Sequence, residues 1–150
     1  MNRDGGSYRD LASVELLNEH KHLQCDIPSY PIALNGVASS ATPSGVVSCG
    51  GCCPYQNICY RLTKSGSWVS FPSMKSERAW LGMKMINGRL WAIGGTGGGK
   101  NSMESIDPEN EDKWTTEFMP FKVSDTCVAE LSDLRLMVIG GWQEYGIVRK

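Results

Sequence analysis

The sequence predicts an all-β chain built from one repeated unit. Four double-glycine pairs, Gly5-Gly6, Gly50-Gly51, Gly94-Gly95 and Gly140-Gly141, follow one another at intervals of 45, 44 and 46 residues. A steady period of this length is typical of an array in which one supersecondary unit recurs. Short apolar runs end at the later pairs, and the chain shows no helical period. The period and the short runs together predict an array of short strands.

The composition fits an ordinary soluble domain and excludes some kinds of partner. Of the 150 residues, 41% are hydrophobic and 21% charged, and the net charge is −1. This balance gives no electrostatic reason to expect nucleic acid or an anionic membrane surface as partner. No apolar run approaches the roughly 20 residues that span a bilayer, and the first ten residues lack a signal-peptide core. Membrane insertion is therefore not expected, and the compartment stays open: cytoplasmic, or secreted if Met1 is not the true start.

Apolar strands are predicted directly before the glycine pairs. The clearest copies lie in 89–95 and 134–141, and 45–51 is a weaker one. A second strand is predicted upstream of each clear copy, over 81–86 and 126–131. Asn87-Gly88 separates two of these runs and predicts a two-residue hairpin with a type I′ turn. The strand before each glycine pair is therefore the second strand of a hairpin.

Two further strands complete each predicted unit. A third strand is expected over 102–106, where Glu104 lies nine residues after Gly95, as Glu15 does after Gly6. Segment 59–62 aligns with it more loosely. The fourth strand carries a tryptophan, Trp68 in 67–71 and Trp114 in 113–118. Only 12–23 could pass for a helix, and the alignment of 13–17 with 102–106 argues against one.

These features resemble the kelch repeat. The resemblance rests on the glycine pairs, the preceding strands, the Glu nine residues later, the Trp after that, and Arg78 in the loop after Met74. It covers nearly the whole chain and implies that each repeat is one four-stranded blade of a β-propeller. The repeats run roughly over 5–49, 50–93 and 94–139, with the start of another at 140–150. The third has Val123-Ser124 where the Arg is expected, and the first has neither the Trp nor the Arg.

Three repeats predict an incomplete propeller. Closed propellers have about 4–8 blades, whereas this chain supplies about three four-stranded antiparallel blades. An open arc leaves unpaired blade edges, so self-association through these edges is expected. The chain is interpreted as a fragment, an incomplete gene model or half of an oligomeric ring.

Physical chemistry gives the recurring residues structural roles. Adjacent glycines let the chain adopt positive φ and let neighbouring backbones approach closely. Trp68, Trp91 and Trp114 are expected to pack between blades, because a buried tryptophan removes a large apolar area from water. Trp80 and Trp142 lie nearer to loops and are candidates for contact with a partner.

Two motifs resemble binding sites and are interpreted as structural. The run 94–100 nearly matches a phosphate-binding loop, but Asn101 replaces the required Ser or Thr and no helix follows. Cys49 and Cys52 form a CxxC motif that lacks the helix of a redox pair. A zinc site would need more ligands nearby, and the histidines, His20 and His22, lie in another repeat. We expect no cofactor and no metal.

The sequence is compatible with two states of the cysteines. Cys49 ends one predicted strand and Cys59 begins its neighbour, so a cross-strand disulfide is geometrically reasonable. Free buried thiols in a cytosolic domain are the other reading, and neither is favoured.

The predicted function is a non-catalytic protein-binding module, since no catalytic triad context is present. The resemblance implies that the partner, a protein of unknown identity, meets loops presented by rigid blades, here 52–57, 74–80, 96–101 and 119–125. The candidate contact residues are Arg78, Trp80, Lys100, Asn101, Lys122 and Trp142. Alternatives are the substrate-recognition part of a ubiquitin-ligase adaptor, a secreted or cell-surface recognition protein, and an enzyme.

Overall fold

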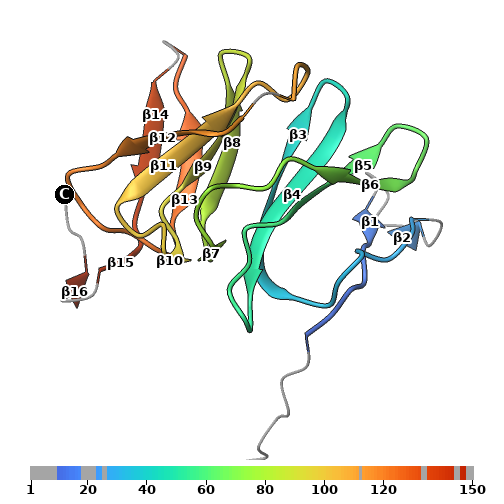
Figure 1. Cartoon of the computed structure of the whole chain (residues 1–150), viewed down its shortest axis with the longest axis horizontal. Helices are drawn as coiled ribbons and strands as arrows, with labels where there is room; N and C mark the ends of the chain where they lie inside the picture. The colour runs from blue at the N-terminus through green and yellow to red at the C-terminus, as the bar shows by residue number, and fades with distance from the viewer. Residues whose placement is uncertain are drawn as a thin grey trace, which may run out of the picture.

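Two four-stranded antiparallel sheets dominate the computed structural model, which describes residues 10–17, 23–24, 27–111, 113–132, 135–143 and 146–147. Figure 1 shows the two sheets side by side. The first has the order β3-β4-β5-β6, with β3 (Asn35–Thr42), β4 (Gly45–Cys52), β5 (Cys59–Thr63) and β6 (Trp68–Phe71). The second has the order β8-β9-β11-β12, with β8 (Gly82–Ile86), β9 (Arg89–Ile93), β11 (Ser102–Ile106) and β12 (Thr115–Phe118).

Four shorter pairings flank these sheets. They join β1 (Leu16–Leu17) to β2 (Leu23–Gln24), β7 (Arg78–Ala79) to β10 (Thr96–Gly97), β13 (Cys127–Glu130) to β14 (Leu136–Ile139), and β15 (Trp142–Gln143) to β16 (Gly146–Ile147). Every assigned element in the described ranges is a strand, which confirms the predicted all-β class. No helix in this part of the chain is long and apolar enough to cross a bilayer.

The predicted hairpin at Asn87-Gly88 is confirmed. Met85 pairs with Leu90 and Ile86 pairs with Arg89, so β8 and β9 are joined by two residues. Asn87 has φ 47° and Gly88 has φ 73°. Positive φ at both central positions is the requirement of a type I′ turn, whose twist matches that of the flanking strands.

Strand β3 was not among the predicted strands. Its sequence consists of small and polar residues and contains no apolar run, so its pattern does not indicate a strand. It forms because β4 pairs along nearly its whole length and because β8 packs beside it. The backbone N–H of Met85 donates to Ser40 Oγ at 3.2 Å. Small side chains on β3 thus suit a close approach between the two sheets.

The sheets succeed one another as neighbouring blades. Strand β8 packs beside β3 on one side and beside β13 on the other (Figure 1). The two complete sheets run over 35–71 and 82–118, and are therefore out of phase with repeats counted from one glycine pair to the next. Each sheet takes its first two strands from the end of one such repeat and its last two strands from the next.

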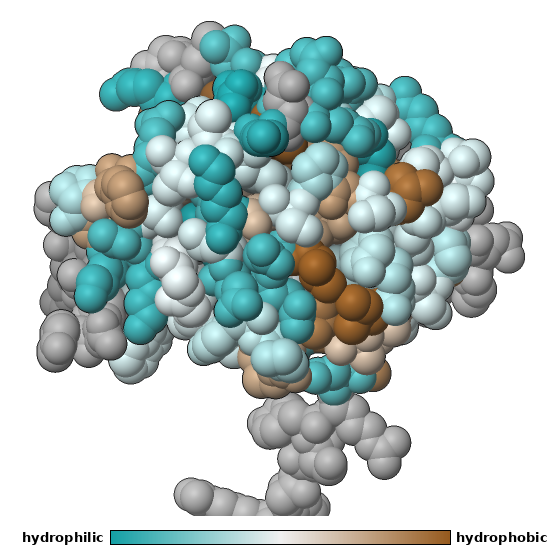
Figure 2. All heavy atoms as spheres, in the orientation of Figure 1, coloured by the Kyte–Doolittle hydropathy of each residue, from teal (hydrophilic) through white to brown (hydrophobic). Residues whose placement is uncertain are grey.

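The core lies between and within the two complete sheets. Trp114 is only 2% exposed, and its indole N–H donates to the carbonyl oxygen of Pro72, which follows β6, at 2.8 Å. Trp114 therefore packs at the boundary between the two blades. Trp68 is half-buried in β6 and packs edge-on against Tyr30, and Trp91 is half-buried in β9. On the face drawn in Figure 2, the largest group of hydrophobic side chains forms one patch, and smaller hydrophobic spots lie apart from it among hydrophilic side chains.

Candidate protein-interaction site

Four loops form one continuous surface, which we call the rim and define as residues 52–57, 74–80, 96–101 and 119–125. The rim lies at the edge where Figure 1 labels β7 and β10. The first two loops are joined by the backbone N–H of Arg78, which donates to the carbonyl of Gln56 at 2.9 Å. The second and third are joined by Gly98, whose N–H donates to the carbonyl of Glu77 at 3.0 Å. Backbone bonds thus link loops from different blades.

The last loop is fastened to the other loops in the same way. The N–H of Val123 donates to the carbonyl of Lys100 at 2.9 Å, and that of Asp125 donates to the carbonyl of Trp80 at 2.9 Å. Bonds that satisfy backbone groups of irregular segments also restrict their motion. The rim is therefore a connected frame rather than a set of independent loops.

The glycine pairs allow this frame to form. Gly95 has φ 93°, and its N–H donates to the carbonyl of Val123 at 2.8 Å. A Cβ atom added to Gly95 would lie 2.7 Å from the carbonyl oxygen of Ala79. Both the positive φ and the close backbone approach require glycine at this position.

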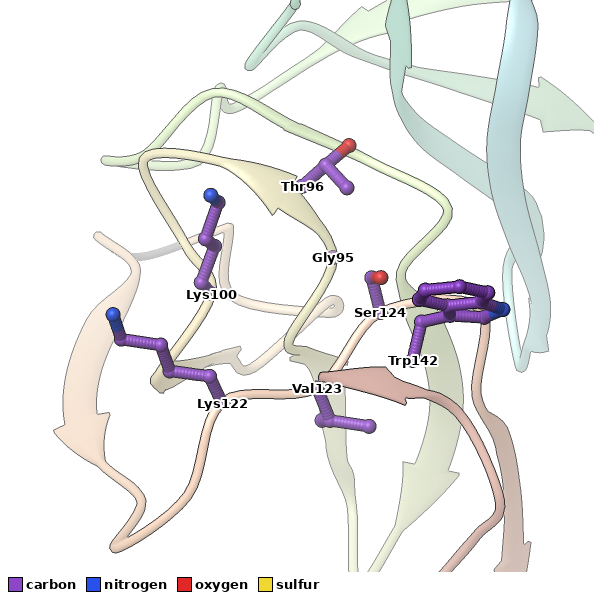
Figure 3. A pocket seen from close by; sticks show the side chains of 7 residues that line it. All are labelled: Gly95, Thr96, Lys100, Lys122, Val123, Ser124 and Trp142. Carbon is purple, nitrogen blue, oxygen red and sulfur yellow. The ribbon is translucent and has the colours of Figure 1, made fainter. Parts of the chain in front are cut away.

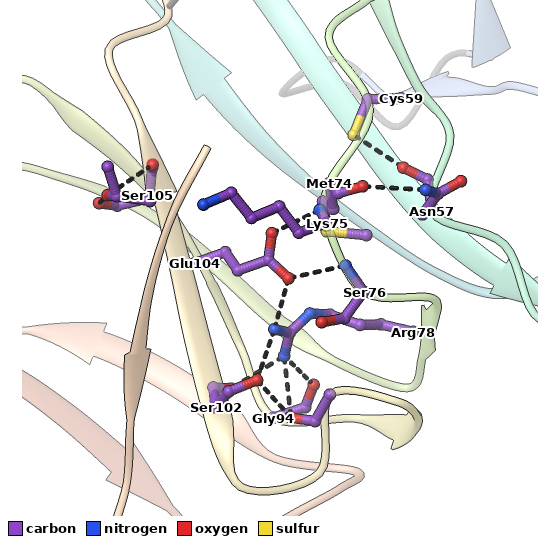
Figure 4. Close-up of polar contacts among 12 residues, drawn as sticks. Asn57, Cys59, Met74, Lys75, Ser76, Arg78, Gly94, Ser102, Glu104 and Ser105 are labelled. Atoms are coloured by element: carbon purple, nitrogen blue, oxygen red, sulfur yellow. Dashed lines mark hydrogen bonds and ion pairs between the residues drawn. The ribbon is translucent and has the colours of Figure 1, made fainter. Parts of the chain in front are cut away.

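Arg78 does not belong to the exposed surface, which corrects its assignment as a candidate partner contact. Its side chain is 0% exposed. Nη1 donates to the carbonyls of Gly94, Gly99 and Ser102 at 2.8–2.9 Å, and Nη2 donates to Ser102 Oγ and to Glu104 Oε1, each at 2.8 Å (Figure 4). A side chain enclosed in this way cannot touch a partner protein. Arg78 instead holds the rim together from inside.

Glu104 completes this buried network from β11. Its Oε2 accepts a hydrogen bond from the backbone N–H of Lys75 at 2.6 Å, and Oε1 accepts one from the N–H of Ser76 at 3.0 Å and from Arg78. The carboxylate therefore fastens loop 74–80 to the second sheet. Both charged residues stand out in the sequence, but nothing in the sequence pairs them. Glu104 recurs in phase with the glycine pairs, as Glu15, whereas Arg78 has no counterpart in the other repeats.

A shallow hollow of about 120 Å³ lies on the rim. It is lined by Gly95, Thr96, Lys100, Lys122, Val123, Ser124 and Trp142 (Figure 3). The figure shows the two lysine side chains extending on one side of the hollow and the indole of Trp142 on the other. Trp142 is 67% exposed, and two backbone hydrogen bonds with Ser124, at 2.8 and 3.1 Å, fix its position.

The remaining candidate contacts also lie on the rim. Trp80 is partly exposed with φ 51°, and its backbone N–H donates to the carbonyl of Gly36 at 2.8 Å. Asn101 is exposed, and its carbonyl accepts from the N–H of Met119 at 2.8 Å. The structure therefore brings Trp80, Lys100, Asn101, Lys122 and Trp142 onto one surface.

The first repeat differs from the later ones where it can be described. Glu15 is exposed and lies just before β1, whereas its sequence equivalent Glu104 is completely buried. Glu15 also lines a cavity between the N-terminal segment and the first sheet, together with Tyr30 and Trp68. Burial raises the pKa of the Tyr30 phenol. Gly5, Gly6, His20 and His22 lie outside the described residues.

One cysteine pair lies beside the rim and a second lies within it. Cys49 and Cys59 occupy directly opposed positions on β4 and β5, with a Cα–Cα separation of 4.1 Å, and the structure joins them by a disulfide. A second disulfide joins the neighbours Cys52 and Cys53 and was not predicted, although their adjacency was visible in the sequence. Within the described ranges, no group of three or more His, Cys, Asp or Glu is arranged to hold a metal ion.

Comparison with known proteins relates the chain to kelch-repeat proteins. No family model matches the chain. Kelch-like protein 8 from Mus musculus is 33% identical over 112 residues, an alignment that covers 67% of this chain and 18% of the mouse protein. The structure of YjhT, a kelch propeller, matches with a TM-score of 0.67 at 18% identity, over 79% of this chain and 37% of that one. The chain is therefore homologous to kelch-repeat proteins, and its antiparallel sheets match part of a kelch β-propeller.

Proposed function

We propose that the chain is a non-catalytic protein-binding module whose partner contacts the rim. The observation that carries the proposal is the backbone-bonded frame of four loops, which holds exposed side chains in fixed relative positions. A pre-ordered surface loses less conformational entropy when it binds. Rigid scaffolds that present loops are a common way to build a binding site.

The side chains on the rim are of the kinds that contribute most at protein interfaces. Three aromatic residues of the rim, Tyr55, Trp80 and Phe121, are exposed, and the exposed Trp142 borders the rim at the hollow. Trp and Tyr are enriched among interface residues whose truncation costs the most binding energy. Lys100 and Lys122 line the hollow together with Trp142. A partner that places an apolar side chain against Trp142 would complement this hollow.

Homology to kelch-repeat proteins supports the proposal without naming the partner. The chain spans about a fifth of the length of Kelch-like protein 8. Substrate recognition for a ubiquitin ligase, and recognition at the cell surface or after secretion, would both use the rim in the way described. The two roles place the protein in different redox compartments.

The test is site-specific photo-crosslinking in the native cells. A photoreactive amino acid replaces Trp142 in one variant and Lys64 in another. Lys64 is an exposed matched control in the β5–β6 turn, at the opposite end of the first sheet from loop 52–57. We expect a discrete crosslinked partner at position 142 and none at position 64. Crosslinks at position 64 alone would overturn the assignment of the rim.

A further inference from the structure

Two neighbouring cysteines stand where β4 enters the rim. Cys52 is the last residue of β4 and is buried, whereas Cys53 is the first residue after the strand and is exposed. The other pair differs in accessibility, because Cys49 is 0% and Cys59 is 1% exposed. The two pairs belong to the same sheet but meet the solvent differently.

We propose that Cys52 and Cys53 form a thiol–disulfide exchange site whose redox state controls the conformation of rim loop 52–57, and that the Cys49–Cys59 pair does not exchange under the same conditions. The chemical class of the reactant is a small thiol or disulfide such as glutathione. The exchange itself does not depend on the proposed function. The effect of the exchange on partner binding does rest on the proposed function.

Accessibility distinguishes the two pairs. Exchange requires a thiolate to reach one sulfur of the disulfide along the S–S axis. The exposed side of Cys53 allows this approach, whereas both sulfurs of the Cys49–Cys59 pair lie in buried residues. Small thiols therefore reach Cys53 without any opening of the sheet.

The backbone of Cys53 gives a reason why opening this disulfide changes the loop. A disulfide between sequence neighbours closes a ring around a single peptide bond, so the ring fixes the backbone on both sides of it. Cys53 has φ 81°, a conformation that side-chain-bearing residues rarely adopt. Reduction opens the ring and removes this constraint on the Cys53 backbone. Cys53 can then leave the left-handed region, and loop 52–57 changes its conformation.

The reduced form already has a hydrogen-bond acceptor in place. Cys52 Sγ lies 3.2 Å from Asn35 Oδ1. A thiol donates to this oxygen, but a disulfide sulfur cannot because it carries no hydrogen. The Asn35 amide group in turn donates to Asp10 Oδ1 at 2.6 Å, which fixes the amide orientation. Cys52 therefore has two alternative partners, Cys53 when oxidised and Asn35 when reduced.

The reduction balances with two molecules of a small thiol. The first thiolate attacks Cys53 Sγ, the Cys52–Cys53 S–S bond breaks, and Cys52 leaves as a thiolate that takes up a proton. The second thiolate attacks the outer sulfur of the mixed disulfide and releases Cys53, which is protonated in turn. The products are two protein thiols and one small-molecule disulfide, and the reverse reaction restores the ring.

Hydrogen bonds connect loop 52–57 to the rest of the rim. The side-chain amide of Asn57 donates to the carbonyl of Met74 at 2.9 Å, and the N–H of Met74 donates to the carbonyl of Asn57 at 2.9 Å. Gln56 accepts from Arg78 in the same segment. A change in loop 52–57 is therefore passed to loop 74–80, which carries Trp80.

A glutathione titration of the chain tests the exchange. Samples equilibrated at different ratios of reduced to oxidised glutathione are quenched by alkylation in denaturant, and peptide mass spectrometry reports each cysteine. We expect Cys52 and Cys53 to become alkylated together at mild ratios at which Cys49 and Cys59 stay protected. The proposal is overturned if the two pairs are reduced together, or if Cys52 and Cys53 stay alkylatable in fully oxidised glutathione.

An Asn35→Ala variant tests the alternative partner of Cys52. Without the amide acceptor the thiol form loses its hydrogen bond, so the ratio of thiol to disulfide at Cys52–Cys53 should fall about threefold, since a thiol is a weak donor. The Cys49–Cys59 pair in the same samples is the internal control. An unchanged ratio would show that Asn35 does not stabilise the thiol form of Cys52. Both readouts are independent of partner binding, so they separate failure of this proposal from failure of the proposed function.

Discussion

At the residue scale, the buried Arg78–Glu104 pair is the contact on which the rim depends most. Neither side chain is exposed, and their hydrogen bonds occupy both oxygens of the carboxylate and both terminal nitrogens of the guanidinium. A buried ion pair gains little net stability over a well-packed apolar pair, but removal of one partner leaves a desolvated charge. Arg78 Nε is the one buried polar atom of the two side chains without a hydrogen-bond partner, and loss of either residue would leave the other charge buried and uncompensated.

We predict that Glu104→Gln destabilises the chain by about 3–5 kcal/mol in chemical denaturation, because Arg78 then keeps its charge without a counter-charge. Combining Leu at Glu104 with Met at Arg78 should recover part of this loss. The matched control is Glu111→Gln, which breaks the Arg61–Glu111 pair, where the Glu111 side chain is 45% exposed. This variant should cost less than Glu104→Gln, because water reaches the Glu111 side of the pair and Arg61, whose side chain is 11% exposed, keeps its hydrogen bond to the carbonyl of Pro108. Equal losses in the two Gln variants would contradict the assigned role of Glu104.

Trp114 and Trp142 lie at opposite extremes of burial, and their truncations should differ accordingly. Trp114→Ala should cost about 3–5 kcal/mol of unfolding free energy, because it leaves a cavity between the two blades. Trp142→Ala should stay within about 0.5 kcal/mol, as expected for an exposed position. Urea denaturation of both variants measures the difference. A small effect at Trp114 would show that the blade boundary lies elsewhere.

At the element scale, the strands predicted from the sequence are those whose pattern is local. Strands β8 and β9 are apolar runs separated by Asn87-Gly88, and β11 coincides with the predicted strand 102–106. Strand β3 could not be predicted, because its small polar residues form a strand through pairing with β4 and packing against β8. Local propensity is a weak guide where tertiary contacts decide.

The candidate site shows the same contrast between features that a local sequence pattern predicts and features that depend on tertiary contacts. The loop positions of Trp80, Lys100 and Lys122 alone predict that these residues lie on the rim, and Trp142 borders it. Arg78 was misplaced because a loop arginine is usually solvent-facing, whereas here the carbonyls of Gly94, Gly99 and Ser102 converge on it. These three acceptors lie in the single connection from β9 to the start of β11, and they converge on one point only in the folded chain.

The glycine pair after β9 gives a prediction for one element of the rim. Gly95→Val should prevent loop 96–101 from docking and should unfold the second blade, because φ 93° and the nearby carbonyl of Ala79 both exclude a branched side chain. Gly88→Val is the matched control, since Gly88 has φ 73° but no atom within 4 Å of an added Cβ. Hydrogen exchange should show lost protection over β9 and β11 in the Gly95 variant, and a smaller loss confined to the β8–β9 hairpin in the Gly88 variant, where only φ is strained. Equal loss in both variants would show that φ alone decides, without the close approach.

At the scale of the whole molecule, the blades expose apolar side chains that a neighbouring blade would cover. In the described part of the chain β14 pairs with β13 alone, and it exposes Met137 (39%) and Ile139 (49%). On the first sheet, Val37, Val46 and Val69 are likewise exposed. In the interior of the arc, by contrast, β8 is covered by β3 and by β13. Apolar surface of this kind favours association.

We therefore predict that the 150 residues alone self-associate, either by aggregation or by pairing of two arcs into a closed ring of about six blades. Light scattering should give a mass of at least twice 16.5 kDa. Replacing both Met137 and Ile139 by Lys should shift the population towards the monomer, because a charged side chain cannot be buried unpaired at the contact. Phe118→Lys, at an exposed position on β12, is the matched control and should leave the mass unchanged. A monodisperse 16.5 kDa monomer that melts cooperatively without these substitutions would show that the exposed β14 face is a finished surface of the domain and not a contact between blades.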